Sequence, residues 1–230
     1  MTSKLEGLEI IVIKWLSLLF FLGLNSVVCW AHFPVFLKAD PTPQNPHKLS
    51  RPYQKSIAIY TRFENDKDVD VYRFRLKEED LKKGSIEILI GSLVPSCKPL
   101  EDLLISWSLI GPKQESLSQE LDKEVLEGVK LHDSLGALTV KNTVQGKAWY
   151  EPYTAHHYFY QKRKKIILSL PGEYSIYVWP LNNKKGDYVF EFGTEEIWSL
   201  ADILYTMSVY PKLLFEAEIS TDDCTTTESP

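Results

Sequence analysis

The chain has 230 residues, of which 44% are hydrophobic, 12% aromatic and 25% charged, and its formal net charge is -5. This is globular composition, sufficient for one domain with a well-packed core and short appendages. The acidic balance excludes a generally basic surface, so we expect no nucleic-acid partner. The many aromatic residues favour strands, because their rings pack well on a pleated surface.

Residues 1–31 are predicted to be a targeting segment. Lys4 and Lys14 give it a positive flank, and Trp15–Leu24 is a nearly unbroken apolar run. That run has the length of a signal-peptide core and is shorter than the roughly 20 apolar residues of a membrane span. The alternative is an uncleaved anchor helix over residues 10–31. Either interpretation predicts an exported protein that is periplasmic, extracellular or membrane-anchored facing outside the cytoplasm.

The end of this segment raises the question of a metal site. Cys29 and Ala31 provide small residues at the positions that signal peptidase prefers, so cleavage after Ala31 would make His32 the first residue. Its α-amine and imidazole would then chelate copper or nickel, with His156 or His157 as a third ligand. Adjacent residues of a strand point to opposite faces, so only one of that pair can join. The alternative is an N-terminus that serves packing alone.

Two cysteines follow the targeting segment, Cys97 and Cys224. In an oxidising compartment they are able to form a disulfide, and the alternative is that both are unpaired, one buried and one in the C-terminal tail. Cys29 is a third candidate for modification, because S-V-V-C faintly resembles a lipoprotein acceptor site. Residues 219–230 form a polar tail that we expect to be disordered.

A proline-rich lead-in, residues 32–54, is expected to be extended and to contain no strand, because proline cannot donate to a β-ladder. Residues 55–193 then show short alternating segments separated by Gly, Pro and Asn turns, which predicts an all-β, antiparallel, jelly-roll-like sandwich. A charged stretch, residues 113–134, is either a long loop or one short helix. The residues expected in the core include Phe74, Ile88, Ile176 and Phe190.

One convincing helix follows, within a C-terminal extension over residues 194–218. We expect it to run from Glu195 to Met207, with Thr194 as N-cap and acidic residues in the first turn. Its apolar stripe is predicted to pack on the sandwich and consists of Ile197, Leu200, Ala201 and Leu204.

Four segments occur in a suggestive order: D-V-D-V-Y-R-F-R-L, L-L-I-S-W-S-L-I-G-P, L-P-G-E-Y-S-I-Y-V-W and G-D-Y-V-F-E-F-G. Their order resembles bacterial pre-peptidase C-terminal domains, which are jelly rolls. A-H-F-P-V-F, Y-E-P-Y-T and F-G-T-E-E-I-W-S-L resemble more closely an uncharacterised group of secreted prokaryotic β-sandwich proteins. The resemblance covers roughly residues 31–215. It implies an accessory sandwich with no established activity, and the histidine pair and the basic run at 162–165 depart from it.

Alternating carboxylates suggest a second metal. Asp66, Asp68 and Asp70 offer oxygen ligands of the kind that calcium prefers. An EF-hand loop is excluded, because Val71 and Lys77 stand where glycine and an acid are required. The alternative is a solvated turn whose last aspartate caps the hairpin.

Catalytic patterns are absent from the sequence. It contains no G-x-S-x-G, H-E-x-x-H, C-x-x-C or glycine-rich phosphate loop. Glu151 could be half of a glycosidase pair, but that reaction needs a second carboxylate roughly 5 to 10 Å away, and no strong candidate exists. We therefore expect a non-enzymatic protein.

Two surface features point to partners. An aromatic platform for glycans would comprise Tyr150, Tyr153, Tyr158, Tyr160, Tyr177 and Trp179. The basic run Lys162–Lys165 could contact anionic lipid or lipopolysaccharide. The alternatives are ordinary sandwich faces and a solvated strand edge.

Together these patterns predict an exported, non-enzymatic β-sandwich protein of the cell envelope with a binding or structural role. A copper- or nickel-binding protein using His32 and a carbohydrate-binding module are the alternatives. No cofactor is expected beyond copper or calcium. The partner classes are the cell envelope, a glycan, or a membrane reached through residues 10–31.

Overall fold

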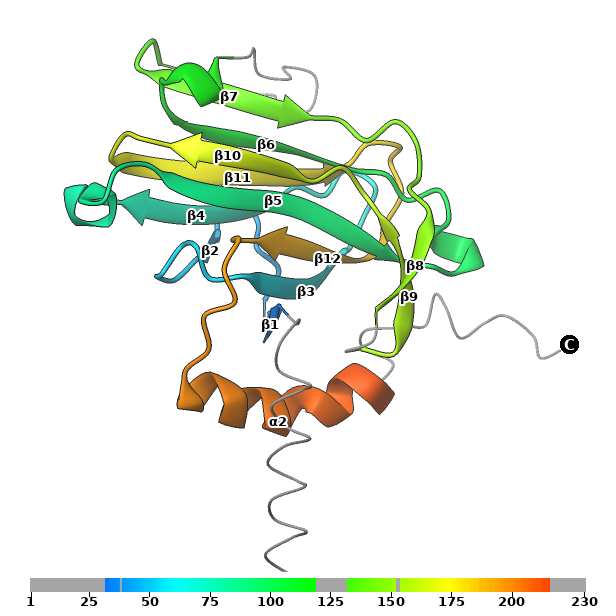
Figure 1. Cartoon of the computed structure of the whole chain (residues 1–230). Coiled ribbons are helices and arrows are strands. Elements are labelled where there is room, and N and C mark those ends of the chain that lie inside the picture. Colours follow the sequence, from blue (N-terminus) through cyan, green and yellow to red (C-terminus); the bar gives the residue numbers. More distant parts are fainter. Residues whose placement is uncertain (1–31, 38, 119–131, 152–153, 216–230) are drawn as a thin grey trace, which may run out of the picture. The chain divides into compact units, whose positions relative to one another are not determined.

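A computed structural model of the chain describes residues 32–37, 39–118, 132–151 and 154–215. Within this part the chain is mostly β and forms two sheets that enclose a core (Figure 1). The seven-stranded sheet has the order β1 (Phe33–Phe36), β3 (Ile57–Phe63), β12 (Gly186–Phe192), β5 (Ile86–Pro95), β9 (His156–Tyr160) and β8 (Ala148–Glu151), with β10 (Lys164–Leu168) also paired to β5. The five-stranded sheet has the order β2 (His47–Lys48), β4 (Asp70–Leu76), β11 (Gly172–Pro180), β6 (Ile105–Pro112) and β7 (Leu135–Val140).

The remaining elements are short turns and one helix. The 3₁₀ turns are η2 (Glu78–Leu81), η3 (Lys98–Leu100) and η4 (Glu115–Leu117), and the helix is α2 (Leu200–Phe215). The stretch predicted as a loop or short helix thus contains η4, and residues 119–131 lie outside the described residues. Among the described residues, no helix is long and apolar enough to cross a membrane. The predicted targeting segment 1–31 and tail 219–230 also lie outside them.

The sandwich predicted from the alternating pattern is confirmed, with one correction at its edges. Most strand pairs are antiparallel, but β1 pairs in parallel with β3 and β2 pairs in parallel with β4. Both edge strands come from the lead-in, which we had expected to contain no strand. Pro34 is accommodated in β1 because an edge strand need not donate a hydrogen bond on its outer side.

The predicted core residues are buried. Phe74 is 3% exposed, and Ile88, Ile176 and Phe190 are fully buried. Aromatic rings from the two sheets stack across the interior, as Tyr72 of β4 does on Phe190 of β12 with ring centroids 4.3 Å apart. Each large ring of this kind removes a large apolar area from water and so contributes strongly to the stability of the sandwich.

The predicted helix was wrong in its start, its end and its buried face, because α2 runs from Leu200 to Phe215 and not from Glu195 to Met207. Thr194 is not the N-cap, because its N–H and that of Glu195 donate to the Gln54 carbonyl at 2.8 and 2.7 Å. Those bonds continue the sheet edge and delay the helix to Leu200. There Ser199 and Asp202 cap it reciprocally, with Asp202 N–H donating to Ser199 Oγ at 3.2 Å and Ser199 N–H donating to Asp202 Oδ2 at 2.7 Å.

The stripe that we expected on the sandwich faces outward instead. Leu200 is 72% exposed, Leu204 59% and Ile197 38%. The face of α2 toward the sandwich carries Thr206, which is 9% exposed, and Asp202, whose carboxylate lies 2.6 Å from the Lys55 ammonium. Polar anchoring therefore overrides the apolar pattern on which the prediction depended.

One cysteine of the predicted pair is described. Cys97, in the loop after β5, is disulfide-bonded. The other two cysteines of the sequence, Cys29 and Cys224, lie outside the described residues.

Candidate metal centre

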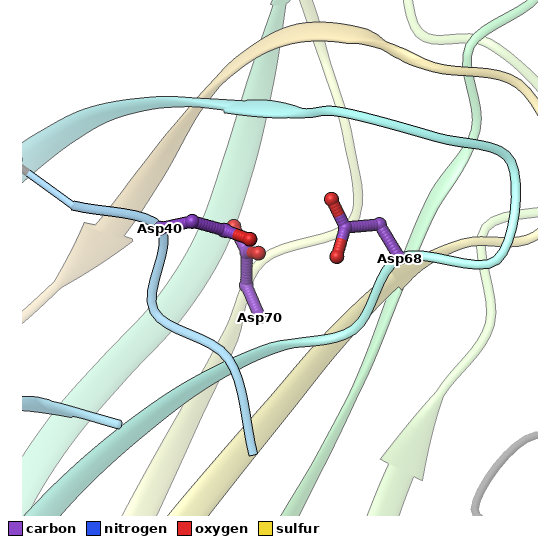
Figure 2. A group of neighbouring side chains, drawn as sticks. All are labelled: Asp40, Asp68 and Asp70. Atoms are coloured by element: carbon purple, nitrogen blue, oxygen red, sulfur yellow. The ribbon is translucent and has the colours of Figure 1, made fainter. Parts of the chain in front are cut away.

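Three carboxylates from separate parts of the chain meet at one end of β4. Asp40, Asp68 and Asp70 each place an oxygen so that all three atoms lie within 4.8 Å of one another. Figure 2 shows the Asp40 and Asp70 carboxyl groups side by side and Asp68 facing them. Two of these residues belong to the predicted calcium group. Asp66 does not join them: it is exposed in the preceding turn, and Asp40 stands in its place.

Asp70 is buried because of its position in β4. It begins the row that continues through Tyr72, Phe74 and Leu76 into the core, so its side chain points inward and is 0% exposed. Tyr188, from the opposite sheet, donates a hydrogen bond to Asp70 Oδ2, and the Tyr72 hydroxyl lies 3.2 Å from the Tyr188 hydroxyl. This chain of hydrogen bonds fixes Oδ2 of Asp70, whereas Oδ1 is buried and has no hydrogen-bond partner among the described residues.

Asp68 closes the turn between β3 and β4. Its Oδ2 accepts the N–H of Glu64 at 2.7 Å, and Asn65 Oδ1 accepts the N–H of Lys67 at 3.0 Å in the same turn. Asp68 therefore caps this turn, whereas the alternative interpretation assigned the cap to the last aspartate, Asp70, which is buried. The hydrogen bond from Glu64 occupies one oxygen of Asp68, and the second oxygen remains for a ligand. The Asp68 residue is 8% exposed.

Asp40 reaches the group through the lead-in. The N–H of Val71 donates to the carbonyl of Pro41, which holds the lead-in against the start of β4. A turn follows, in which Asn45 N–H donates to the Thr42 carbonyl at 3.0 Å. The cluster thus joins the lead-in to a distant part of the sequence, the β3–β4 turn and the strand β4 that directly follows it.

Burial and the mutual repulsion of the carboxylates dominate the electrostatics of the cluster. Burial, together with the charges of Asp40 and Asp68, raises the pKa of Asp70 to about 9. Burial and the nearby Asp68 charge also raise the pKa of Asp40. Asp40 Oδ1 and Asp70 Oδ1 are buried, and neither has a hydrogen-bond partner among the described residues. Buried acceptors that lack donors are costly, and a cation would satisfy them.

The ligand chemistry fits calcium. Ca²⁺ takes six to eight oxygen ligands in flexible geometry, and extracellular sites bind it with dissociation constants of roughly 10⁻⁴ to 10⁻³ M. The three carboxylates supply the charged part of such a shell, with water to complete it. Mg²⁺ fits less well, because it demands strict octahedral geometry and sheds its water reluctantly.

The predicted histidine ligands, unlike the three carboxylates, do not lie in a cluster of metal-ligating side chains among the described residues. His156 and His157 are adjacent in β9, where His156 stands opposite Glu151 and the His157 ring lies 5.1 Å from that of Tyr150. Within the described ranges, neither belongs to a group of three metal-ligating side chains. Glu151, the glycosidase candidate, accepts the N–H of Thr154 at 2.6 Å and so caps a turn. The copper site at His32 stays a prediction.

The aromatic platform is only partly on the surface. Tyr158 is 1% exposed and Trp179 is 2% exposed, so neither can stack on a sugar. Tyr150 is 45% exposed, and the prediction omitted its neighbour Trp149, which is 42% exposed and contacts Tyr160 with ring centroids 5.3 Å apart. Tyr153 lies outside the described residues, and Tyr177 is half-buried.

The basic run makes contacts within the protein. Arg163 Nε donates to Oε2 of the fully buried Glu191 at 2.6 Å, and its guanidinium lies 4.0 Å from the centre of the Tyr160 ring. Lys165 Nζ lies 3.0 Å from a carboxylate oxygen of Glu87. These contacts give the basic run a structural role, because they connect it to β12 through Glu191 and connect β10 to β5 through Glu87.

No protein-family model matches the sequence, and no curated protein matches it. Among solved structures, the chain is similar to the pre-peptidase C-terminal domain of a collagenase from Bacillus anthracis, with 15% identity, a TM-score of 0.32, and coverage of 71% of this chain and 97% of that one. It is also similar to the Yersinia pseudotuberculosis-derived mitogen, with 7% identity, a TM-score of 0.32, and coverage of 64% and 92%. A third is CorA, a surface-associated copper-binding protein of Methylomicrobium album BG8, with 10% identity, a TM-score of 0.23, and coverage of 70% and 96%. The distant resemblance to a pre-peptidase C-terminal domain is thus confirmed, and at these TM-scores none of the three carries an argument about a ligand.

Proposed function

We propose that this protein is an exported, non-enzymatic β-sandwich of the cell envelope that is stabilised by calcium at Asp40, Asp68 and Asp70. The observation that carries the proposal is the Asp70 carboxyl, which is 0% exposed and has one buried oxygen without a hydrogen-bond partner among the described residues. One carboxylate oxygen of Asp70 lies within 4.8 Å of an oxygen from each of two further carboxylates, Asp40 and Asp68.

The proposed role of the ion is to fasten the lead-in to the sandwich. Asp40 is the lead-in's contribution, Asp68 belongs to the β3–β4 turn, and Asp70 belongs to the core strand β4. Without a cation, the three carboxylates repel one another, and the buried Asp70 is kept neutral by a proton. With a cation bound, all three carboxylates are attracted to the ion, and the lead-in is held against the edge of the sandwich.

Export and calcium dependence are mutually consistent. Weak extracellular calcium sites are occupied only where the ion is abundant, at roughly millimolar concentration. Such a site would be empty during synthesis in the cytoplasm and would fill after export, so the domain would reach full stability in its working compartment.

The test is thermal unfolding with and without about 10 mM CaCl₂ at pH 7.5, a concentration chosen to saturate a weak extracellular site. This concentration is about 10- to 100-fold above the expected dissociation constant, so it should contribute about 1.4–2.7 kcal/mol, which corresponds to a rise of about 3–10 °C in Tm for a chain of this size. The same concentration of MgCl₂ should have a clearly smaller effect.

Two variants make the test specific. Asp68→Asn removes one carboxylate from the cluster and should abolish most of the calcium response. Asp66→Asn removes the same charge from an exposed position of the same turn and should retain it. An equal response in both variants, or none in the unmodified protein, would refute the proposal.

A further inference from the structure

The outward face of α2 is apolar from Leu200 to Pro211. Leu200, Leu204, Met207 and Pro211 recur at intervals of three or four residues, and all are exposed, with Leu200 at 72%, Leu204 at 59% and Met207 at 46%. We call these four residues the outer stripe. Exposed leucines are ordinary when scattered, but a continuous row on one helix face usually marks a contact surface.

The outer stripe carries no formal charge. Between Leu200 and Pro211 the sequence has a single Asp, Glu, Lys or Arg, namely Asp202. Its carboxylate lies 2.6 Å from the Lys55 ammonium on the sandwich side. Covering the stripe with an apolar medium would therefore leave no charged group without water.

The opposite face holds α2 on the sandwich next to β1 (Figure 1). The Phe33 ring lies 5.9 Å from the Trp198 ring and 5.4 Å from the Tyr205 ring. The Lys55 ammonium lies 3.9 Å from the centre of the Phe33 ring. Phe33, the first residue of β1, is thus the anchor point of the helix.

The covalent chain connects this anchor point to the apolar sequence segment 10–31. Ala31 and Phe33 are two residues apart, so their α-carbons are separated by at most about 7 Å. If residues 10–31 are retained in a membrane, Phe33 and the helix packed on it are held at the surface of that membrane. The local concentration of lipid around the outer stripe is then very high.

We propose that the outer stripe of α2 lies on a phospholipid bilayer, with its apolar side chains among the acyl chains near the headgroups. Interfacial helices use this geometry, and Trp and Tyr residues commonly flank it, as Trp198 and Tyr205 do here. Most such helices add Lys or Arg for anionic lipid. This stripe has none, so zwitterionic lipid is sufficient and the contact is insensitive to salt.

The other occupants fit less well. The outer stripe exposes on the order of 400 Å², so an isologous pair would bury on the order of 800 Å², less than a stable dimer interface requires. The stripe spans about 17 Å of helix, whereas 22 residues span about 33 Å even in the compact form of a helix, so the stripe is too short to cover an apolar segment of that length. A bilayer has no such limit on its size and can cover the whole outer stripe.

The experiment uses the full chain in phosphatidylcholine vesicles that contain a photoactivatable diazirine phospholipid, with labelled peptides identified by mass spectrometry. The peptide containing Leu200 and Leu204 should be labelled, equally at low and at about 1 M salt, where the Debye length is about 3 Å. The peptide containing Ile167 of β10, which is 57% exposed, should not be labelled. It is the internal control for an exposed apolar residue elsewhere.

The double variant Leu200→Glu/Leu204→Glu should reduce labelling of α2 about tenfold, since it places two charges in the apolar contact. Ile167→Glu is the matched control and should leave the labelling of α2 unchanged. All three positions are exposed, so the variants should unfold at nearly the same temperature as the unmodified chain.

Several results would overturn the proposal. They are a chain that remains unbound when vesicles are added, labelling of α2 that the double variant does not change, and cross-links from α2 to a second copy or to residues 10–31 in place of lipid. The proposal rests on export and on retention of residues 10–31, but not on calcium. Labelling measured in EDTA separates the two, because failure of the calcium site would leave the lipid contact intact.

Discussion

Replacing Asp70 with Asn should change how stability depends on pH. In the calcium-free protein, the raised pKa of Asp70, about 9, means that the folded state binds one proton near neutral pH. In the unfolded chain the pKa returns to about 3.9, so the unfolded state has already lost that proton. The Asn variant keeps the shape, its amide oxygen can accept the Tyr188 hydroxyl, and it does not titrate.

The magnitude follows from proton linkage. A group whose pKa is raised in the folded state contributes stability that is complete below its unfolded pKa and is lost as pH rises toward its folded pKa. Between pH 6 and pH 8 the folded state holds about one proton more than the unfolded state, so the free energy of unfolding falls by roughly 2–3 kcal/mol. Asp70→Asn should remove this loss.

Urea unfolding at pH 6 and pH 8 in the presence of a chelator measures the effect. The unmodified protein should lose about 2–3 kcal/mol over this interval, and Asp70→Asn should lose clearly less. Asp66→Asn is the control and should follow the unmodified protein, because Asp66 is exposed. Identical pH dependence in the unmodified protein and in Asp70→Asn would refute the assignment of the proton to Asp70.

Three further substitutions test the packing by urea unfolding. Phe190→Ala empties a fully buried ring site and should cost about 3–5 kcal/mol, and a loss below about 1 kcal/mol would show that the site collapses without strain. Arg163→Ala leaves the fully buried Glu191 carboxylate without its cation and should cost about 3 kcal/mol, a loss that the double variant with Glu191→Gln should partly restore. Ser199→Ala removes the N-cap of α2 and should cost about 1 kcal/mol, whereas Thr194→Ala should cost less, since Thr194 is outside the helix.

Much of the sandwich could be predicted from the sequence because its signal is local. Alternation along residues 72–76 and 86–90 gave the inward faces correctly, since a strand buried on one side must repeat every two residues. The same alternation extended back by two residues places Asp70 in the core row, a signal that the prediction did not use.

The third carboxylate of the cluster could not be predicted in this way. Asp40 meets Asp70 only because the lead-in runs in parallel beside β4 and the carbonyl of Pro41 accepts the N–H of Val71. Pairing between segments some 30 residues apart has no signature in either segment alone. Asp66 was chosen for its spacing, but a tight turn points it to solvent.

The helix shows a different limit. Its N-cap was misplaced because Thr194 and Glu195 satisfy local helix rules, yet their N–H groups are used by the Gln54 carbonyl at the sheet edge. The stripe at Leu200 and Leu204 was assigned to the core because apolar residues usually face inward. The Lys55–Asp202 ion pair and the Phe33 ring contacts turn the other face to the sandwich.

Calorimetric titration of the full chain with CaCl₂ at pH 7.5, carried out in two buffers of different ionisation enthalpy, tests the central claim most directly. If Asp40, Asp68 and Asp70 hold the ion, one Ca²⁺ should bind with a dissociation constant of roughly 10⁻⁴ to 10⁻³ M. Binding should release about one proton, because the Asp70 carboxyl, with its pKa of about 9, must ionise to become a ligand. Binding without proton release, or no binding at millimolar calcium, would contradict the account.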